Sequence, residues 1–274
     1  MNLFSAAETA NNYSAAGAAK TKLPFWKMLI LAILAGMLIG FPSAVTNMAC
    51  YTQTSNSVSR IISGVLFAFG LGTVVLTGAE LFTGNTLITI SVLDKKAKLT
   101  GMLRNWIVVY IGNFIGSIFV AFLCAQFGWL NAANGDTPNA LAIATMKVAQ
   151  AKMTMPFWNA FFMGVLCNIL VTLGVLLSLS AKDFTGRILG AWIPVMFFVV
   201  CGFNHSIADM TYCTMGLFAK NVYAEGAAFT QLTWGNYFAG NMLPVTLGNI
   251  LGGCMVGFIM WFCYVRKAEA KKKK

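Results

Sequence analysis

The sequence of 274 residues contains one histidine, His205, and it lies in the polar stretch Asn204-His205-Ser206. An imidazole can donate or accept a hydrogen bond, and it can transfer a proton near neutral pH. The stretch interrupts a hydrophobic run that is long enough to cross a bilayer, and an ionisable group at that depth usually belongs to a substrate or ion pathway. We therefore expect His205 to line a polar pathway rather than to be a satisfied core histidine.

A second polar stretch, from Thr77 to Thr86, interrupts another hydrophobic run. The hydroxyl group of Thr83 can donate and accept hydrogen bonds beside a small polar solute. Glu80 is an acid at membrane depth, and we expect it to be protonated or to cap backbone amides of the stretch. Asp209 is expected to play the equivalent part near His205, and a cation site that uses both acids stays open as an alternative.

The same residue types argue against catalysis. A single histidine cannot form a histidine metal cluster or ligate a haem from both sides. Ser206 adjoins His205 in sequence, which is poor geometry for a nucleophile and its base. The seven cysteines lie in or beside hydrophobic runs without a CxxC spacing, which is typical of reduced packing residues. We predict that the chain is no enzyme and that it holds no metal and no cofactor.

The composition is that of a membrane protein. Hydrophobic residues make up 58% of the chain and charged residues 10%, and the mean hydropathy is +0.73, far above the values of soluble domains. Most of the net charge of +11 lies in short clusters beside hydrophobic runs, which favours topology signals and lipid contacts over nucleic-acid binding. We predict an all-α membrane protein with six transmembrane helices, at about 25–50, 60–93, 104–128, 157–180, 188–222 and 236–265.

Lysine and arginine residues orient these spans. Most of them fall on one side, including Lys95, Arg104, Arg187 and the four C-terminal lysines. By the positive-inside rule both termini are cytoplasmic in a multi-pass protein of the cell membrane. We expect a cytoplasmic N-terminal segment over 1–24, a six-span domain over 25–266 and a basic cytoplasmic tail over 267–274.

The chain also repeats itself. Pro24-Phe25-Trp26 opens the first span and Pro156-Phe157-Trp158 the fourth, while Gly112-Asn113 in the third span matches Gly248-Asn249 in the sixth. Each half, about 25–128 and 157–265, holds three spans, and an odd number places the halves in opposite orientations. We therefore expect an inverted repeat whose broken second and fifth spans meet near the middle of the bilayer.

Four motifs resemble the formate/nitrite transporter family. They are Glu80-Leu81-Phe82-Thr83-Gly84, Cys167-Asn168-Ile169-Leu170-Val171, Gly202-Phe203-Asn204-His205-Ser206 and the stretch from Gly248-Asn249 to Gly253. The resemblance covers about residues 20–266. It implies an aquaporin-like protomer with a 3+3 inverted repeat, a homopentamer with a pore in each protomer, and passage of small anions such as formate, nitrite and hydrosulfide.

The resemblance also implies roles for particular residues. His205 and Thr83 match the central hydrogen-bonding pair, Lys152 matches a lysine of the outer vestibule, and Asn168 and Asn204 would fix the loops around His205. The apolar constrictions implied by the resemblance are an inner one of Leu71, Leu81 and Phe198 and an outer one of Phe67, Phe82 and Val171. The segment 1–22 corresponds to one that is proposed to gate the inner mouth in this family.

Asn204 departs from the pattern, because many members carry a glutamate immediately before the histidine. Without that carboxylate a permanently charged His205 is disfavoured. Our leading hypothesis is that an anion attracted by Lys152 is protonated near His205 and crosses as the neutral acid, since an unpaired ion in an apolar constriction loses its hydration. The alternatives are a pure anion channel without proton transfer and a non-conducting membrane scaffold.

Overall fold

The computed structural model describes residues 2–131 and 139–266, and within these ranges the chain is built from helices. The segments there that are long and apolar enough to cross a membrane are six, as expected: Phe25–Cys50, Asn56–Thr77, Leu99–Gln126, Phe157–Ser180, Phe184–Cys201 and Trp234–Val265. The prediction of an all-α protein with six apolar spans is confirmed.

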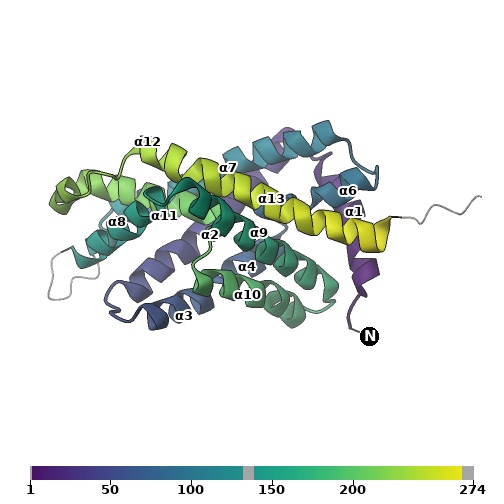
Figure 1. Ribbon diagram of the computed structural model, residues 1–274, viewed down its shortest axis with the longest axis horizontal. Helices are drawn as coiled ribbons and strands as arrows, with labels where there is room; N and C mark the ends of the chain where they lie inside the picture. The colour runs from purple at the N-terminus through teal and green to yellow at the C-terminus, as the bar shows by residue number, and fades with distance from the viewer. Residues whose placement is uncertain (1, 132–138, 267–274) are drawn as a thin grey trace, which may run out of the picture.

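The helices pack into one elongated bundle (Figure 1). In chain order they are α1 (Ala6–Lys20), α2 (Phe25–Cys50), α3 (Asn56–Phe67), α4 (Phe69–Thr77), α5 (Phe82–Asn85), α6 (Ile88–Leu93), α7 (Leu99–Gln126), α8 (Ala140–Met153), α9 (Phe157–Ser180), α10 (Phe184–Cys201), α11 (Ser206–Val222), α12 (Trp234–Asn236) and α13 (Leu243–Met260). Short turns of other helix types are η1 (Trp129–Asn131), η2 (Ala224–Ala228), η3 (Tyr237–Met242) and η4 (Trp261–Val265). The helix α1 and the last turns of the described chain lie at one end, and α8 lies at the opposite end.

Two stretches between helices lie inside the hydrophobic runs. The chain leaves α4 after Thr77 and enters α5 at Phe82, and it leaves α10 after Cys201 and enters α11 at Ser206. Each helix ends on a glycine with positive φ, +68° at Gly78 and +75° at Gly202, a left-handed conformation that favours glycine. The arrangement of these stretches as an inverted repeat in the middle of a bilayer stays a prediction.

The spans pack in two close pairs. Helix α2 lies along α7, and α9 lies along α13. A Cβ atom on Gly116 would collide with the carbonyl oxygen of Ile33, and one on Gly252 would collide with the carbonyl oxygen of Val165. Small residues allow such close crossings between membrane helices. The first and third spans therefore form one pair, and the fourth and sixth spans form another.

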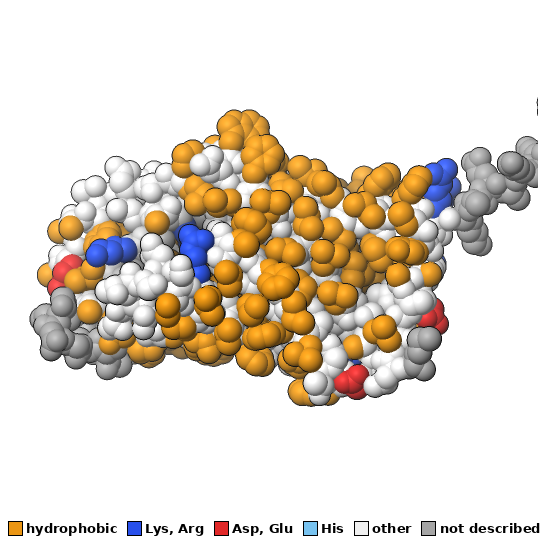
Figure 2. Space-filling view, turned by 60° about the horizontal axis from the view of Figure 1, so that its bottom comes forward, with side chains coloured by type: hydrophobic (Ala, Val, Ile, Leu, Met, Phe, Trp, Pro, Cys, Tyr) orange, Lys and Arg blue, Asp and Glu red, His pale blue; other side chains and the backbone are white. Residues whose placement is uncertain are grey.

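Large apolar side chains are exposed on the outside of the spans. Ile30, Ile107, Phe162 and Phe258 each keep half or more of their surface accessible. Figure 2 shows hydrophobic side chains covering the central part of one face, with few charged side chains among them. A surface of this kind suits contact with lipid or with the apolar face of a neighbouring subunit.

Candidate functional site

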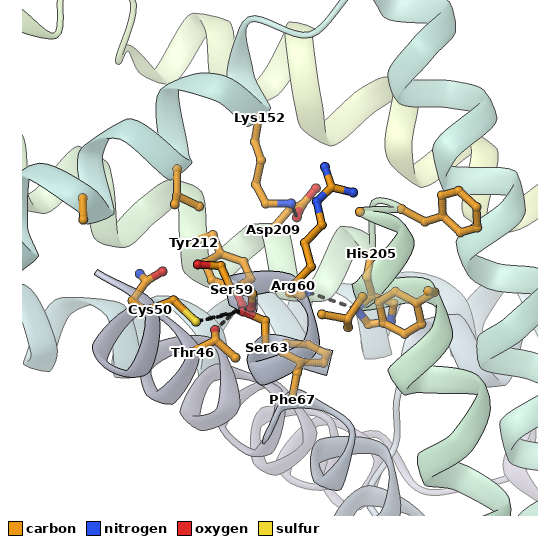
Figure 3. A pocket seen from close by; sticks show the side chains of 18 of the residues that line it. Thr46, Cys50, Ser59, Arg60, Ser63, Phe67, Lys152, His205, Asp209 and Tyr212 are labelled. Carbon is orange, nitrogen blue, oxygen red and sulfur yellow. Dashed lines mark hydrogen bonds and ion pairs between the residues drawn. The ribbon is translucent and has the colours of Figure 1, made fainter. Parts of the chain in front are cut away.

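Three cavities follow one another inside the helix bundle. The largest, of about 320 Å³, is lined by Arg60, Lys152 and His205 among others (Figure 3), and we call it the Lys152 cavity. Another, of about 180 Å³, is lined by Tyr13 and Lys20 among others, and we call it the Lys20 cavity. A small central cavity of about 10 Å³ shares wall residues with both. The three cavities thus mark a path that narrows at its centre.

The central cavity is almost entirely apolar. Its wall consists of His205 together with Ile39, Phe67, Leu71, Leu81, Val171, Val195 and Phe198. Leu71 and Leu81 also line the Lys20 cavity, whereas Phe67 and Phe198 also line the Lys152 cavity. Five of the residues expected at constrictions are therefore brought together here, and Phe198 lies with Phe67 towards the Lys152 cavity.

His205 presents one polar group to this apolar wall. Its Nε2 lies 2.8 Å from Oγ1 of Thr83, and its Nδ1 accepts a hydrogen bond from the backbone N–H of Ala208 at 3.1 Å. A neutral imidazole carries its proton on the nitrogen that does not accept, so the proton lies on Nε2 and is donated to Thr83. The Ala208 contact holds the ring as the cap of α11 and favours its neutral form.

A buried asparagine holds the backbone on both sides of His205. Asn249 donates from Nδ2 to the carbonyl oxygens of Gly164 at 2.8 Å and Asn204 at 3.1 Å. Its Oδ1 accepts from the backbone N–H of Ser206 at 2.9 Å. Backbone groups away from water in a membrane need such partners, and Asn249 therefore supports the non-helical stretch that presents the imidazole.

Asn113 makes the same set of contacts in the first half of the chain. It donates to the carbonyl oxygens of Ala32 at 2.8 Å and Glu80 at 2.9 Å, and it accepts from the N–H of Phe82 at 2.9 Å. The Phe82 ring packs edge-on against Tyr110 with 4.8 Å between centroids, and it is not part of the wall of the three cavities. Sequence reasoning missed both asparagines, although their matching Gly-Asn motifs were visible.

Asn168 ties the two halves together near the centre. Its Nδ2 donates to the carbonyl oxygen of Asn249 at 2.6 Å, to Oγ1 of Thr86 at 3.1 Å and to the carbonyl oxygen of Thr83 at 3.3 Å. The segment that carries Thr83 is therefore bonded to the span that supports His205.

Lys152 sits in a charged cluster at one end of the path. Its Nζ lies 2.6 Å from Oδ1 of Asp209 and donates to Oδ1 of Asn204 at 3.1 Å. Figure 3 shows the Lys152 side chain directed at Asp209 and the Arg60 side chain beside them. Arg60 donates to the carbonyl oxygen of Val200 at 3.3 Å. Arg60 is a second cation on the wall of this cavity, and the sequence did not predict it there.

Glu80 is paired with a lysine at the other end of the path. Its Oε1 lies 2.6 Å from Nζ of Lys20, and its Oε2 accepts from Nδ2 of Asn85 at 2.6 Å. The expectation that Glu80 caps backbone amides is therefore wrong, because both carboxylate oxygens are bonded to side chains. Lys20 was missed because it lies 60 positions away, in the segment before the first span.

Helix α1 lies against the Lys20 cavity. Its Tyr13 hydroxyl donates to the carbonyl oxygen of Gly84 at 3.0 Å, and its Ser14 hydroxyl donates to Asp94 at 2.6 Å. Together with Lys20 these contacts hold α1 against the polar stretch from Thr77 to Thr86 and the turn after α6. The segment before the first span is thus an ordered helix that forms part of the cavity wall.

A path through six apolar spans, wide at both ends and narrowed to an apolar centre with one imidazole, defines a membrane transport protein. The formate/nitrite transporter profile matches residues 7–262. The chain belongs to the formate/nitrite transporter family, and the resemblance seen in the sequence motifs is confirmed. Members of this family are transporters rather than enzymes.

Individual relatives agree with this assignment. The chain is 34% identical to a probable formate transporter of Methanothermobacter thermautotrophicus, over 96% of this chain and 98% of that one. It is 33% identical to the formate channel FocA of Escherichia coli, over 96% and 93% respectively. Among solved structures, a pentameric formate channel with formate bound matches with a TM-score of 0.78 and 33% identity, over 88% of this chain and 98% of that chain. An ion channel of the same family matches with a TM-score of 0.82 and 27% identity, over 93% and 98%.

Proposed function

We propose that the protein conducts small monovalent anions of weak acids, with formate as its main substrate and nitrite or hydrosulfide as further ones. The observation that carries this proposal is the central cavity, where His205 is the polar group in an apolar wall. Only a small solute fits through a cavity of about 10 Å³, and only one that accepts a hydrogen bond gains from an imidazole N–H. The names of the formate channels among its relatives support the choice of formate.

The passage is proposed to be linked to protons. Lys152 and Arg60 raise the concentration of anions in the Lys152 cavity by electrostatic attraction. A bare ion is disfavoured at the apolar centre because it loses its hydration there, so the anion combines near His205 with a proton of the outer solution, crosses as the acid and releases the proton on the other side. Because Nδ1 of His205 accepts from Ala208, the ring acts as a neutral donor through Nε2 and the proton that moves comes from the solvent.

We propose a homopentamer in the cell membrane with both termini in the cytoplasm. A pentameric formate channel among the similar structures supports the assembly. The exposed apolar surfaces of the spans suit contacts with lipid and with neighbouring subunits. The lysine clusters before the first span and after α6 support a cytoplasmic location for the end that carries α1. The basic tail over 267–274 lies outside the described residues.

The function is tested with purified protein in liposomes and a panel of formate, nitrite, hydrosulfide, acetate and lactate. We expect formate uptake well above that of empty liposomes, nitrite and hydrosulfide uptake close behind, and acidification of the lumen that accompanies formate entry. A current that follows the formate gradient without proton movement would favour a pure anion channel. An absence of flux for the whole panel, with a stable partner protein recovered, would favour a membrane scaffold instead.

Arg60 is expected to determine how well dilute anions are captured. Arg60 is an exposed residue, and a guanidinium group can bind a carboxylate through two donors. We expect Arg60→Gln to raise the half-saturating formate concentration about two- to fivefold at low ionic strength, the range of exposed charge interactions, and less at high salt. Uptake at graded formate and salt concentrations measures this. The control is Lys147→Gln, which removes an exposed cation of α8 that does not line the cavity; equal curves for both variants would exclude the role.

A further inference from the structure

The two charged clusters occupy equivalent places in the two halves of the chain. The contacts of Asn113 and Asn249 are matched residue for residue, since Ala32 corresponds to Gly164, Glu80 to Asn204 and Phe82 to Ser206. The residue numbers of matched positions differ by a constant amount in each part of the repeat. The difference is 132 in the first span and the segment before it, 124 in the polar stretches and 136 in the last span. Applied to the clusters, the same offsets pair Lys20 with Lys152, Asn85 with Asp209 and Asn105 with Asn241.

The Lys20 cluster is a closed ring of contacts. Lys20 pairs with Glu80 at 2.6 Å, and Glu80 accepts from Asn85 at 2.6 Å. Asn85 donates in turn to Oδ1 of Asn105 at 2.9 Å, and Nδ2 of Asn105 donates to the backbone carbonyl of Lys20 at 3.4 Å. The carboxylate is thus on the first residue of the pair 80/85, and the amide is on the second.

The Lys152 cluster has residues at the four matching positions, with the carboxylate and the amide exchanged between the second and third of them. Lys152 contacts the amide oxygen of Asn204 at 3.1 Å and the carboxylate of Asp209 at 2.6 Å. Asn241 donates to Asp209 at 3.0 Å, and it also donates to the backbone carbonyl of Lys152 at 3.4 Å, as Asn105 does for Lys20. Here the amide is on the first residue of the pair and the carboxylate is on the second.

We propose that Asn204 and Asp209 act as one compensating pair. Asp209 supplies the negative charge that neutralises Lys152, and a glutamate at position 204 would supply the same charge. Asp209 is on this view a positioning residue for Lys152 and not a cation site. The cluster therefore keeps its negative charge although position 204 is an asparagine, because Asp209, one turn into α11, carries that charge. The proposal rests on the anion transport proposed above.

The physical consequence is that each position depends on the other. Asp209 is 1% exposed and the Lys152 side chain 20%, so removing the carboxylate alone leaves a largely buried ammonium group with an amide as its neighbour. Such a half-pair is strongly disfavoured. Adding a second carboxylate at position 204 alone places two acids against one lysine, and one of them must then take a proton. Either single change therefore disturbs the charge balance around the Lys152 ammonium group.

The double change gives the Lys152 cluster the arrangement of residue types that the Lys20 cluster has. In the structure Oδ1 of Asn241 is buried without a hydrogen-bond partner among the described residues. An amide at position 209 would donate to that oxygen, in the way that Asn85 donates to Asn105. A glutamate at position 204 would meet Lys152 as Glu80 meets Lys20. The exchange keeps the net charge and the number of polar partners.

The test is a cycle of Asp209→Asn, Asn204→Glu and the double variant, measured by formate uptake into liposomes and by the thermal unfolding midpoint in detergent. We expect each single change to lower uptake at low formate concentration at least about tenfold and to lower the midpoint, because it breaks a buried pair. The double variant is expected to recover a large part of both losses, mainly through the half-saturating concentration.

Different results would refute the compensating pair and the proposed transport function. A double variant that is no better than Asp209→Asn in uptake and in unfolding, while the wild-type protein transports formate, would overturn the pair and leave the transport function intact. If the wild-type protein moves no formate, the transport function is wrong, and the unfolding cycle alone still decides whether the two positions compensate. Additive losses in that cycle would refute the pair, because coupled residues are non-additive.

Discussion

Formate uptake is expected to fall at least about tenfold when His205 is replaced by Phe. The central cavity then loses its polar group, and its wall becomes wholly apolar. A hydrogen bond to a charged or strongly polar solute contributes about 1.5–3 kcal/mol, which corresponds to about ten- to a hundredfold in rate. Initial uptake rates at several pH values measure the effect.

A His205→Gln variant separates the two ways in which the imidazole could act. Its amide still donates a hydrogen bond but carries no titratable proton. Because Nδ1 of His205 is occupied by Ala208, we expect this variant to keep most of the flux. Loss of flux equal to that of His205→Phe would instead show that the ring itself transfers the proton. Undiminished flux with unchanged pH dependence in His205→Phe would refute the pathway role of the residue.

The spans were predictable because the bilayer imposes its length requirement on each segment separately. The runs that open at Phe25 and Phe157 were placed correctly from apolar length alone. The run around 188–222 was less well delimited, because its apolar helix ends at Cys201 and α11 continues after the polar stretch. A hydropathy pattern does not register whether the backbone stays helical across a short polar stretch.

The partners of the charged residues were not predictable in the same way. Glu80 was expected to cap its own stretch, and its lysine belongs to the N-terminal segment before the first span, for which no contact with Glu80 was predicted. Arg60 reaches the path because α3 lies beside α10, which no local pattern encodes. The offset of 132 between the two Pro-Phe-Trp motifs also relates Lys20 to Lys152, so the repeat contained a signal for Lys20 that was not followed.

The most damaging structural change is expected to be Asn249→Leu. The leucine fills a similar volume but leaves the N–H of Ser206 and the carbonyl oxygens of Gly164 and Asn204 without this partner. Each buried group left unsatisfied costs about 1–3 kcal/mol, so the variant should lose on the order of 3 kcal/mol or more. The stretch that presents His205 loses its support at the same time, and we expect formate uptake to disappear along with a lower unfolding midpoint.

The control for this experiment is Asn159→Leu, the same exchange at an exposed position of α9, which is expected to leave the midpoint nearly unchanged. Asn113→Leu should reproduce the loss, because Asn113 supports the backbone around Glu80 in the way that Asn249 supports it around Asn204. An Asn249→Leu protein that unfolds at the wild-type temperature would show that the stretch before α11 is held by other contacts. If only stability falls and uptake per folded protein stays, Asn249 supports the fold without positioning His205.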